Sequence, residues 1–207
     1  MSSIINADTS SGLTISSDNS GEIDFQSGGV TKAGINSTGW TGDGSQLSNV
    51  GRLLQVVNLV YSTQSSMTVG TTDTAVTGMN LNITPLAAGS KFRIDVRLFG
   101  EVYSAWQVLF NIHRGAARIN TTSNLKYHGL AMMTQSYGIA TNDSSTPEIL
   151  NLTTIDSTGS TVGTTLTYTL VACADVNRTL WINRCVGAPT TSYETGISEI
   201  IITEIGA

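Results

Sequence analysis

Few side chains in this chain have the types and spacing that nucleophilic or metal chemistry needs. His113 and His128 are its only histidines, and neither stands at a metal-ligand spacing from a cysteine or a carboxylate. Cys173 has no local sequence signature of an activated thiolate. We therefore expect no metal site and no nucleophilic cysteine.

Two carboxylates facing each other at a fixed separation across a cleft could hydrolyse a glycoside. The fifteen acidic residues are instead scattered along the sequence. Asp95 lies between Arg93 and Arg97 in an alternating strand pattern, so we expect a solvent-exposed ion pair there. The glycine-rich segment 42–45 lacks the lysine of a phosphate-binding loop and is interpreted as a turn. The sequence thus predicts a protein that is not an enzyme, with no catalytic residue and no cofactor.

Composition narrows the classes of partner. The net charge is −5 and there is no basic run, so we expect no nucleic acid partner. No stretch approaches the roughly 20 apolar residues of a membrane span, so we expect no membrane insertion. Charged residues are only 12% of the chain, while Ser and Thr together number 54 of 207. A surface made neutral by hydroxyl groups is typical of one that contacts other protein copies.

The two cysteines bear on where the protein folds. Cys173 and Cys185 are expected on two strands that form a hairpin around residues 175–178, too far out of register for a disulfide. Residues 1–11 have neither a basic region nor an apolar core, unlike a secretory signal. Both observations favour reduced thiols and folding in a cytoplasm.

The first 51 residues differ in kind from the rest. They hold nine of the 21 glycines, and short apolar pairs at strand spacing, Leu13/Ile15 and Ile23/Phe25, each follow a glycine. So few apolar groups are close to the lower limit for folding alone. We therefore predict a short β-stalk stabilised by copies of itself or by a partner. Its expected packing residues are Leu13, Ile15, Ile23, Phe25, Ile35, Trp40 and Leu47.

Residues 52–207 show a rhythm of strands and turn-rich loops without helical periodicity. The apolar run at 53–60 is typical of a buried strand. We expect about nine strands in an antiparallel β-sandwich. Their expected ranges are 53–60, 79–83, 92–98, 106–112, 126–133, 148–155, 163–174, 179–186 and 197–205.

Loops at one end of this sandwich are the expected contact surface. If successive strands alternate in direction, the loops at 62–75, 100–105, 135–147 and 175–178 share the end away from the stalk. Loop tyrosines provide contact area and a hydroxyl at low entropic cost. The residues predicted to contact a receptor or glycan are Tyr103, Tyr137, Asn142, Asp143 and Arg178.

Two sequence segments resemble fibre and decoration proteins of tailed bacteriophages, of the marine or cyanobacterial type. The segment Gly42-Asp43-Gly44-Ser45-Gln46-Leu47-Ser48-Asn49-Val50 is similar to one that precedes a domain in such fibres. The later region, from 76–85 to the terminal strand 199–205, resembles their small C-terminal jelly rolls. The resemblance implies a homotrimer in the virion, anchored to the capsid or tail through residues 1–51, with a jelly-roll-like sandwich at 52–207.

The resemblance also implies attachment to a host surface glycan or protein. A stalk of only about fifty residues leaves open a short head fibre, a capsid decoration protein that stabilises the shell, or a short tail fibre. A depolymerase that degrades host glycans is the separate enzyme alternative. In each case the chain would fold in the host cytoplasm before assembly into the particle.

Overall fold

The computed structural model describes residues 23–27, 30–36, 39–41, 52–102, 108–120, 129–133, 146–187 and 194–206. Every regular element in these ranges is a β-strand, and every strand pairing is antiparallel. These ranges accordingly contain no helix that could cross a membrane. The all-β, antiparallel architecture expected from the sequence is confirmed. The chain divides into two compact units, Met1–Val50 and Gly51–Ala207.

The first unit contains a three-stranded sheet. Its strands β1 (Ile23–Ser27), β2 (Val30–Asn36) and β3 (Gly39–Thr41) pair in chain order. Ile23 lies opposite Ile35 on β2, and Ile35 lies opposite Trp40 on β3. The alternate apolar residues of this segment therefore occupy neighbouring register positions across the sheet.

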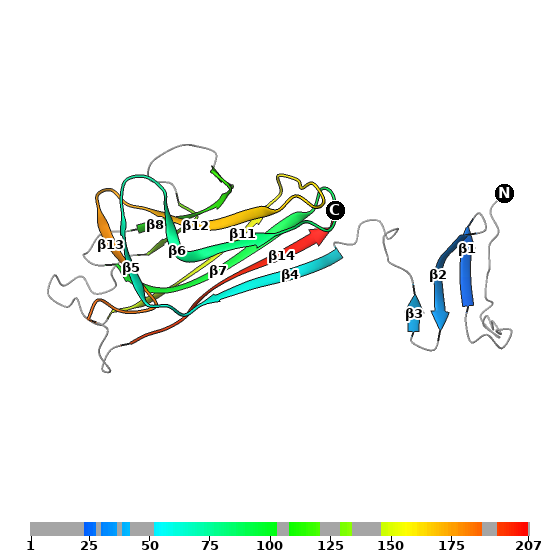
Figure 1. Ribbon diagram of the computed structural model, residues 1–207, viewed down its shortest axis with the longest axis horizontal. Helices are drawn as coiled ribbons and strands as arrows, with labels where there is room; N and C mark the ends of the chain where they lie inside the picture. Colours follow the sequence, from blue (N-terminus) through cyan, green and yellow to red (C-terminus); the bar gives the residue numbers. More distant parts are fainter. Residues whose placement is uncertain are drawn as a thin grey trace, which may run out of the picture. The chain divides into compact units, whose positions relative to one another are not determined.

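The second unit consists of two sheets (Figure 1). One has the order β10-β8-β12-β6, with β9 paired to β8, and the other has the order β4-β14-β7-β13-β5, with β11 paired to β7. The strands are β4 (Arg52–Tyr61), β5 (Ser65–Val69), β6 (Thr74–Ile83), β7 (Lys91–Val102), β8 (Val108–Arg114), β9 (Ala117–Arg118), β10 (Ala131–Met133), β11 (Glu148–Asp156), β12 (Leu166–Cys173), β13 (Arg178–Ile182) and β14 (Ser198–Gly206).

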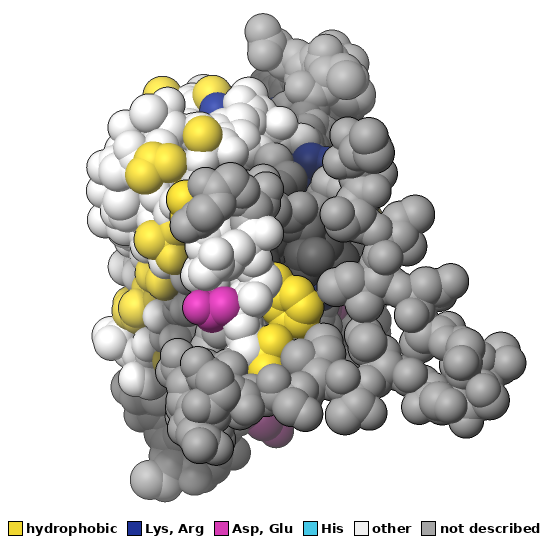
Figure 2. Space-filling view, turned by 90° about the vertical axis from the view of Figure 1, so that its right-hand side faces the viewer, with side chains coloured by type: hydrophobic (Ala, Val, Ile, Leu, Met, Phe, Trp, Pro, Cys, Tyr) yellow, Lys and Arg dark blue, Asp and Glu magenta, His cyan; other side chains and the backbone are white. Residues whose placement is uncertain are grey.

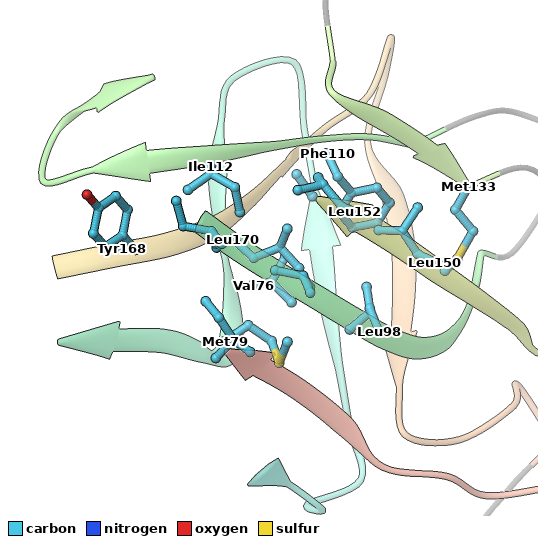
Figure 3. Close-up of a cluster of buried hydrophobic side chains, with 14 of the residues drawn as sticks. Val76, Met79, Leu98, Phe110, Ile112, Met133, Leu150, Leu152, Tyr168 and Leu170 are labelled. Carbon is cyan, nitrogen blue, oxygen red and sulfur yellow. The ribbon is translucent and has the colours of Figure 1, made fainter. Parts of the chain in front are cut away.

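The hydrophobic core lies between these two sheets. On β7 the side chains of Phe92, Ile94, Val96 and Leu98 are buried, as their alternation with charged residues predicts. They belong to one continuous cluster with side chains from β6, β8, β11 and β12, part of which is drawn in Figure 3. Each fully buried aliphatic or aromatic side chain contributes about 1.5–3 kcal/mol to folding, so this cluster is the main stabilising element of the unit.

Strand β7 organises the larger sheet because two strands share one of its edges. Its first half pairs with β14 and its last three residues pair with β13, while β11 covers the opposite edge. Asn183, which is fully buried with φ +60°, follows β13 at this division. Its Nδ2 donates hydrogen bonds to the carbonyl oxygens of Tyr61 (2.8 Å) and Thr63 (3.1 Å), and its Oδ1 accepts one from Ser198 Oγ (2.6 Å). One amide side chain thereby joins the ends of β4, β13 and β14.

Three details of the strand prediction are wrong. Strand β5 was expected to be loop, because only Met67 and Val69 in it are large and apolar. The expected hairpin between residues 163–174 and 179–186 does not form, since β12 and β13 lie in different sheets. The run at 53–60 is an edge strand with an exposed face, not a strand buried on both faces. The two cysteines are nevertheless free and buried, as expected.

Candidate functional site

The predicted contact residues can be placed only in part. Tyr103, Tyr137, Asn142 and Asp143 lie outside the described residues. Arg178 is the first residue of β13, and its Nη2 lies 3.4 Å from Oδ1 of Asp175. Only 14% of its side chain is exposed, so the guanidinium offers little surface to a receptor.

Residues that flank the expected contact loops lie together at one end of the sandwich. The buried carboxylate of Glu101 accepts hydrogen bonds from the backbone N–H groups of Thr146 (3.2 Å) and Val186 (2.6 Å), and from the Thr146 hydroxyl. The N–H of Ala174 donates to the carbonyl oxygen of Gly70 (2.8 Å). Strand β5 was not predicted, but it does not change which loops share an end of the sandwich. It runs in the same direction as β4 along the same sheet edge, so β7 and β13 still run in the expected directions.

A cluster of charged side chains around Asp73 was not predicted from the sequence. Asp73 Oδ2 lies 2.6 Å from His113 Nε2 and 2.5 Å from Arg118 Nε, and Arg118 Nη2 lies 2.5 Å from Asp73 Oδ1. Burial alone would raise the pKa of Asp73, but the hydrogen bonds from Arg118 and His113 outweigh it and hold that pKa below its usual value. The cluster ties the start of β6 to β8 and β9.

Cys173 lies beside this cluster, with its Sγ 4.0 Å from Arg118 Nη2. Burial and then the nearby Asp73 carboxylate raise the pKa of its thiol. A thiol held protonated in this way is a poor nucleophile and a poor metal ligand. The arrangement of Asp73, His113 and Cys173 therefore resembles a catalytic set in composition but lacks the activated thiolate that such a set requires.

A second polar cluster lies at the opposite end of the unit from Glu101. The Tyr168 hydroxyl donates to Asp156 Oδ2 (2.8 Å), and Arg114 Nη1 lies 3.1 Å from the same oxygen. Burial would raise the pKa of Asp156, but hydrogen bonds from Thr158 and Tyr168 and the charge of Arg114 lower it. Burial and the bond to Asp156 raise the pKa of Tyr168. These groups satisfy one another, which is the pattern of a structural anchor.

A recess of about 450 Å³ opens beside this second cluster. Arg114 and the hydroxyl-bearing loop at 158–164 line it. Arg114 Nη1 also donates to the carbonyl oxygen of Gly159 (3.0 Å), and Ser160 Oγ donates to the carbonyl oxygen of Ala87 (3.1 Å). The lining side chains of Arg114, Thr158 and Ser160 are therefore already bonded within the protein.

The outer face of the larger sheet is an exposed surface that extends across four neighbouring strands. Strand register places its outward side chains in rows that run from β4 through β14 and β7 to β11. The rows are Val56–Thr203–Arg93–Ile155, Asn58–Ile201–Asp95–Thr153 and Val60–Glu199–Arg97–Asn151. Three of the four exposed outward side chains of β4 are apolar, with Asn58 between Val56 and Val60, and the centre of the face is charged.

The apolar side of this face is the β4 patch, consisting of Leu53, Val56 and Val60. These side chains are 62%, 55% and 51% exposed. In the coloured part of Figure 2, yellow apolar side chains lie among white polar groups and backbone. An apolar row on an edge strand is an interaction site by default.

The charged centre of the face behaves as the sequence predicts. Arg93 Nε lies 2.9 Å from Asp95 Oδ2, and the two side chains are 52% and 29% exposed. Thr153 Oγ1 also donates to Asp95 (2.7 Å). A hollow of about 160 Å³ beside this pair is lined by Arg97 and Glu199 among others. The carboxylate of Asp95 is engaged by its neighbours, which makes it a poor nucleophile.

The small sheet of the first unit also exposes apolar side chains. Phe25, Val30 and Ile35 are 40%, 57% and 40% exposed, while Ile23 is half-buried. Trp40 occupies the register position opposite Ile35. The other expected packing residues, Leu13, Ile15 and Leu47, lie outside the described residues. We refer to Ile23, Phe25 and Ile35 as the stalk row.

The described part of the chain holds no group of three or more His, Cys, Asp or Glu side chains arranged for a metal ion. Two apolar surfaces are exposed in this part of the chain, the stalk row and the β4 patch. Exposed apolar surfaces of this kind often mark sites of contact with other proteins. Comparison with protein-family models and with curated proteins finds no match to this chain.

Proposed function

We propose that this chain is a structural protein of a bacteriophage virion. In this proposal it forms a homotrimeric fibre, anchored to capsid or tail through the leading 51 residues. The sandwich at 52–207 projects outward and attaches to a host surface glycan or protein. The observation that carries the proposal is the exposed stalk row, because a three-stranded sheet with 40% of Phe25 and Ile35 in water needs a further protein surface to cover it.

The winding of the second unit supports the jelly-roll part of the proposal. A jelly roll consists of eight strands wound through two four-stranded sheets. Here β4, β7, β11 and β14 belong to one sheet, and β6, β8, β10 and β12 belong to the other. In chain order the path through these eight strands changes sheet at each step except from β8 to β10. This alternation is the one expected of two Greek keys and supports the proposal. Strands β5, β9 and β13 extend this scheme.

The polar clusters suit a fibre that must stay folded outside a cell. Asp73, Glu101 and Asp156 each bind several groups from separate segments, and the side chains of all three are largely buried. They hold loops and sheet ends in place, and they leave the contact loops as the means of recognition. A rigid scaffold that carries variable loops is a common design for surface recognition.

The location of the protein on the particle is the first test of this proposal. An antibody against residues 53–207 should label intact particles, and the purified full chain should block adsorption of those particles to host cells. Particles whose protein lacks the sandwich should lose adsorption. Particles without any label would contradict the proposal.

Two further measurements identify the alternatives. Normal adsorption together with lower heat resistance of particles that lack the sandwich would indicate a decoration protein. Release of reducing sugar ends from host polysaccharide would indicate a depolymerase. A variant carrying both Tyr137→Ala and Arg178→Ala tests the predicted contact residues separately, since unchanged adsorption would exclude them.

A further inference from the structure

Strands β4 and β14 carry apolar residues on both faces. Among the described residues, only the inner face is covered, by the hydrophobic core. The runs Leu53 to Val60 and Ile200 to Ile202 are of the kind found in strands with protein on each side. On the inner face, Val57 and Leu59 pack against the core, and Ile200 and Ile202 are fully buried. On the outer face the β4 patch is more than half exposed. The sequence is therefore suited to a second cover that the described residues do not supply.

Strand β4 also has a free edge. Among the described residues it pairs only with β14, so the second edge of this ten-residue strand has no strand partner. Long apolar edge strands promote association unless a proline, a bulge or a charge protects them. Within 53–61 there is neither a proline nor a charged residue, and the one irregularity lies at the strand start, near Leu53.

Two opposite charges beside the patch indicate which partner fits. Arg97 and Glu199 occupy facing register positions on β7 and β14. Within the described part of the chain, neither residue forms an ion pair. One surface thus carries an apolar row and both members of a charge pair. Such a surface is complementary to another copy of itself, because Arg97 of one copy can meet Glu199 of the next.

We propose that the β4 patch is the contact surface between sandwich units of neighbouring copies of this chain. Leu53, Val56 and Val60 of the copies pack together, and Arg97 and Glu199 pair across the contact. The arrangement around a three-fold axis rests on the proposed function, whereas the contact itself rests on the sandwich alone. The leading segment is then not the only part that holds the copies together.

The test is sedimentation equilibrium of the full chain carrying both Val56→Asp and Val60→Asp. The control is Val162→Asp, because Val162 is 55% exposed like Val56 but lies in the loop between β11 and β12. Two carboxylates in the contact should weaken association by about a hundredfold or more, while the control keeps the wild-type mass. Far-UV circular dichroism establishes that all variants are folded.

A charge exchange provides a second, independent readout. Arg97→Glu and Glu199→Arg should each weaken association about tenfold, and the double variant should recover it, because the pair is restored with its sign reversed. The proposal is overturned if wild type is a monomer, if the double aspartate variant keeps its mass, or if Val162→Asp loses as much. These results concern mass in solution, whereas particle labelling and adsorption decide the proposed function, so the two failures are distinguishable.

Discussion

Replacing Asn183 with alanine tests whether one buried amide holds the place where β13 and β14 divide the edge of β7. The substitution removes two donated hydrogen bonds, to Tyr61 and Thr63, and the acceptor of the Ser198 hydroxyl. It also places alanine at φ +60°, a conformation that asparagine tolerates better. The main-chain bonds of residue 183 to Phe99 and Gly196 are untouched.

The expected loss follows from these contacts. Three side-chain hydrogen bonds at about 1 kcal/mol each, plus roughly 1 kcal/mol for left-handed alanine, give a loss of about 4 kcal/mol in the free energy of unfolding. In a unit of this size each kcal/mol lowers Tm by about 2–4 °C. The Asn183→Ala protein should therefore unfold about 8–16 °C below wild type.

Asn120 provides a matched control, because it is the other described non-glycine residue at positive φ (+54°). Its side chain bonds Thr154 and Ile155 but is exposed to water. Asn120→Ala should cost only about 1–2 kcal/mol, since water replaces its partners. Urea denaturation followed by circular dichroism measures both variants at one protein concentration. An Asn183→Ala loss no larger than that of Asn120→Ala would refute the reasoning.

Three further predictions concern charge, the stalk and backbone packing. The pKa of Asp73 is depressed in the folded chain, so its carboxylate stabilises the fold above about pH 4, and this stabilisation is lost as the pH falls further. At pH 7 the unfolding free energy of the Asp73→Asn protein should therefore be lower than that of wild type, and it should change less than that of wild type on acidification. Phe25→Ser together with Ile35→Ser should lower the mass of the full chain in light scattering, because the stalk row then has less apolar surface to share. Gly100→Ala should lower Tm strongly, because its Cβ would collide with the carbonyl oxygen of Trp181 on β13. The control Gly163→Ala has open space at its Cβ, so it should lower the free energy of unfolding by only about 1 kcal/mol. A thermal melt measures both variants.

The strands that alternate strictly could be predicted from the sequence. Phe92, Ile94, Val96 and Leu98 alternate with charged residues, and the buried face of β7 is the face they predict. Period-two alternation states directly which side chains face a core. The short strand β5 gives too weak a signal, because its five residues include two serines and a threonine.

Strand partners could not be predicted in the same way. A hairpin between β12 and β13 is the default for adjacent strands joined by a short turn. Here the chain crosses from one sheet to the other between Cys173 and Arg178, so the two strands have no common ladder. Which sheet a strand joins depends on which part of the core it must bury, and no local sequence pattern contains that information. The exposed face of β4 was missed for the same reason. An apolar run shows that a strand is suited to burial, but it does not show whether the same chain covers both of its faces.

The charged cluster around Asp73 shows a further limit. His113 and Arg118 are 40 and 45 residues from Asp73 in sequence. They come together because β8 pairs with β9 and with β12, and β12 in turn pairs with β6, which directly follows Asp73. The sequence shows His113 as an isolated histidine without a metal-ligand spacing. Its role as a partner of Asp73 could be found only from the folded chain.

The pairing of Arg52 with Gly206 determines how the sandwich responds to mechanical force. The first and last described residues of this unit lie side by side, whereas Gly70 and Ala174 lie at the other end of the strands. Tension between the start of β4 and the far loops runs along the strands, so it shears the whole β4–β14 ladder at once. Tension between Arg52 and Gly206 would instead separate that ladder one hydrogen bond at a time, at much lower force.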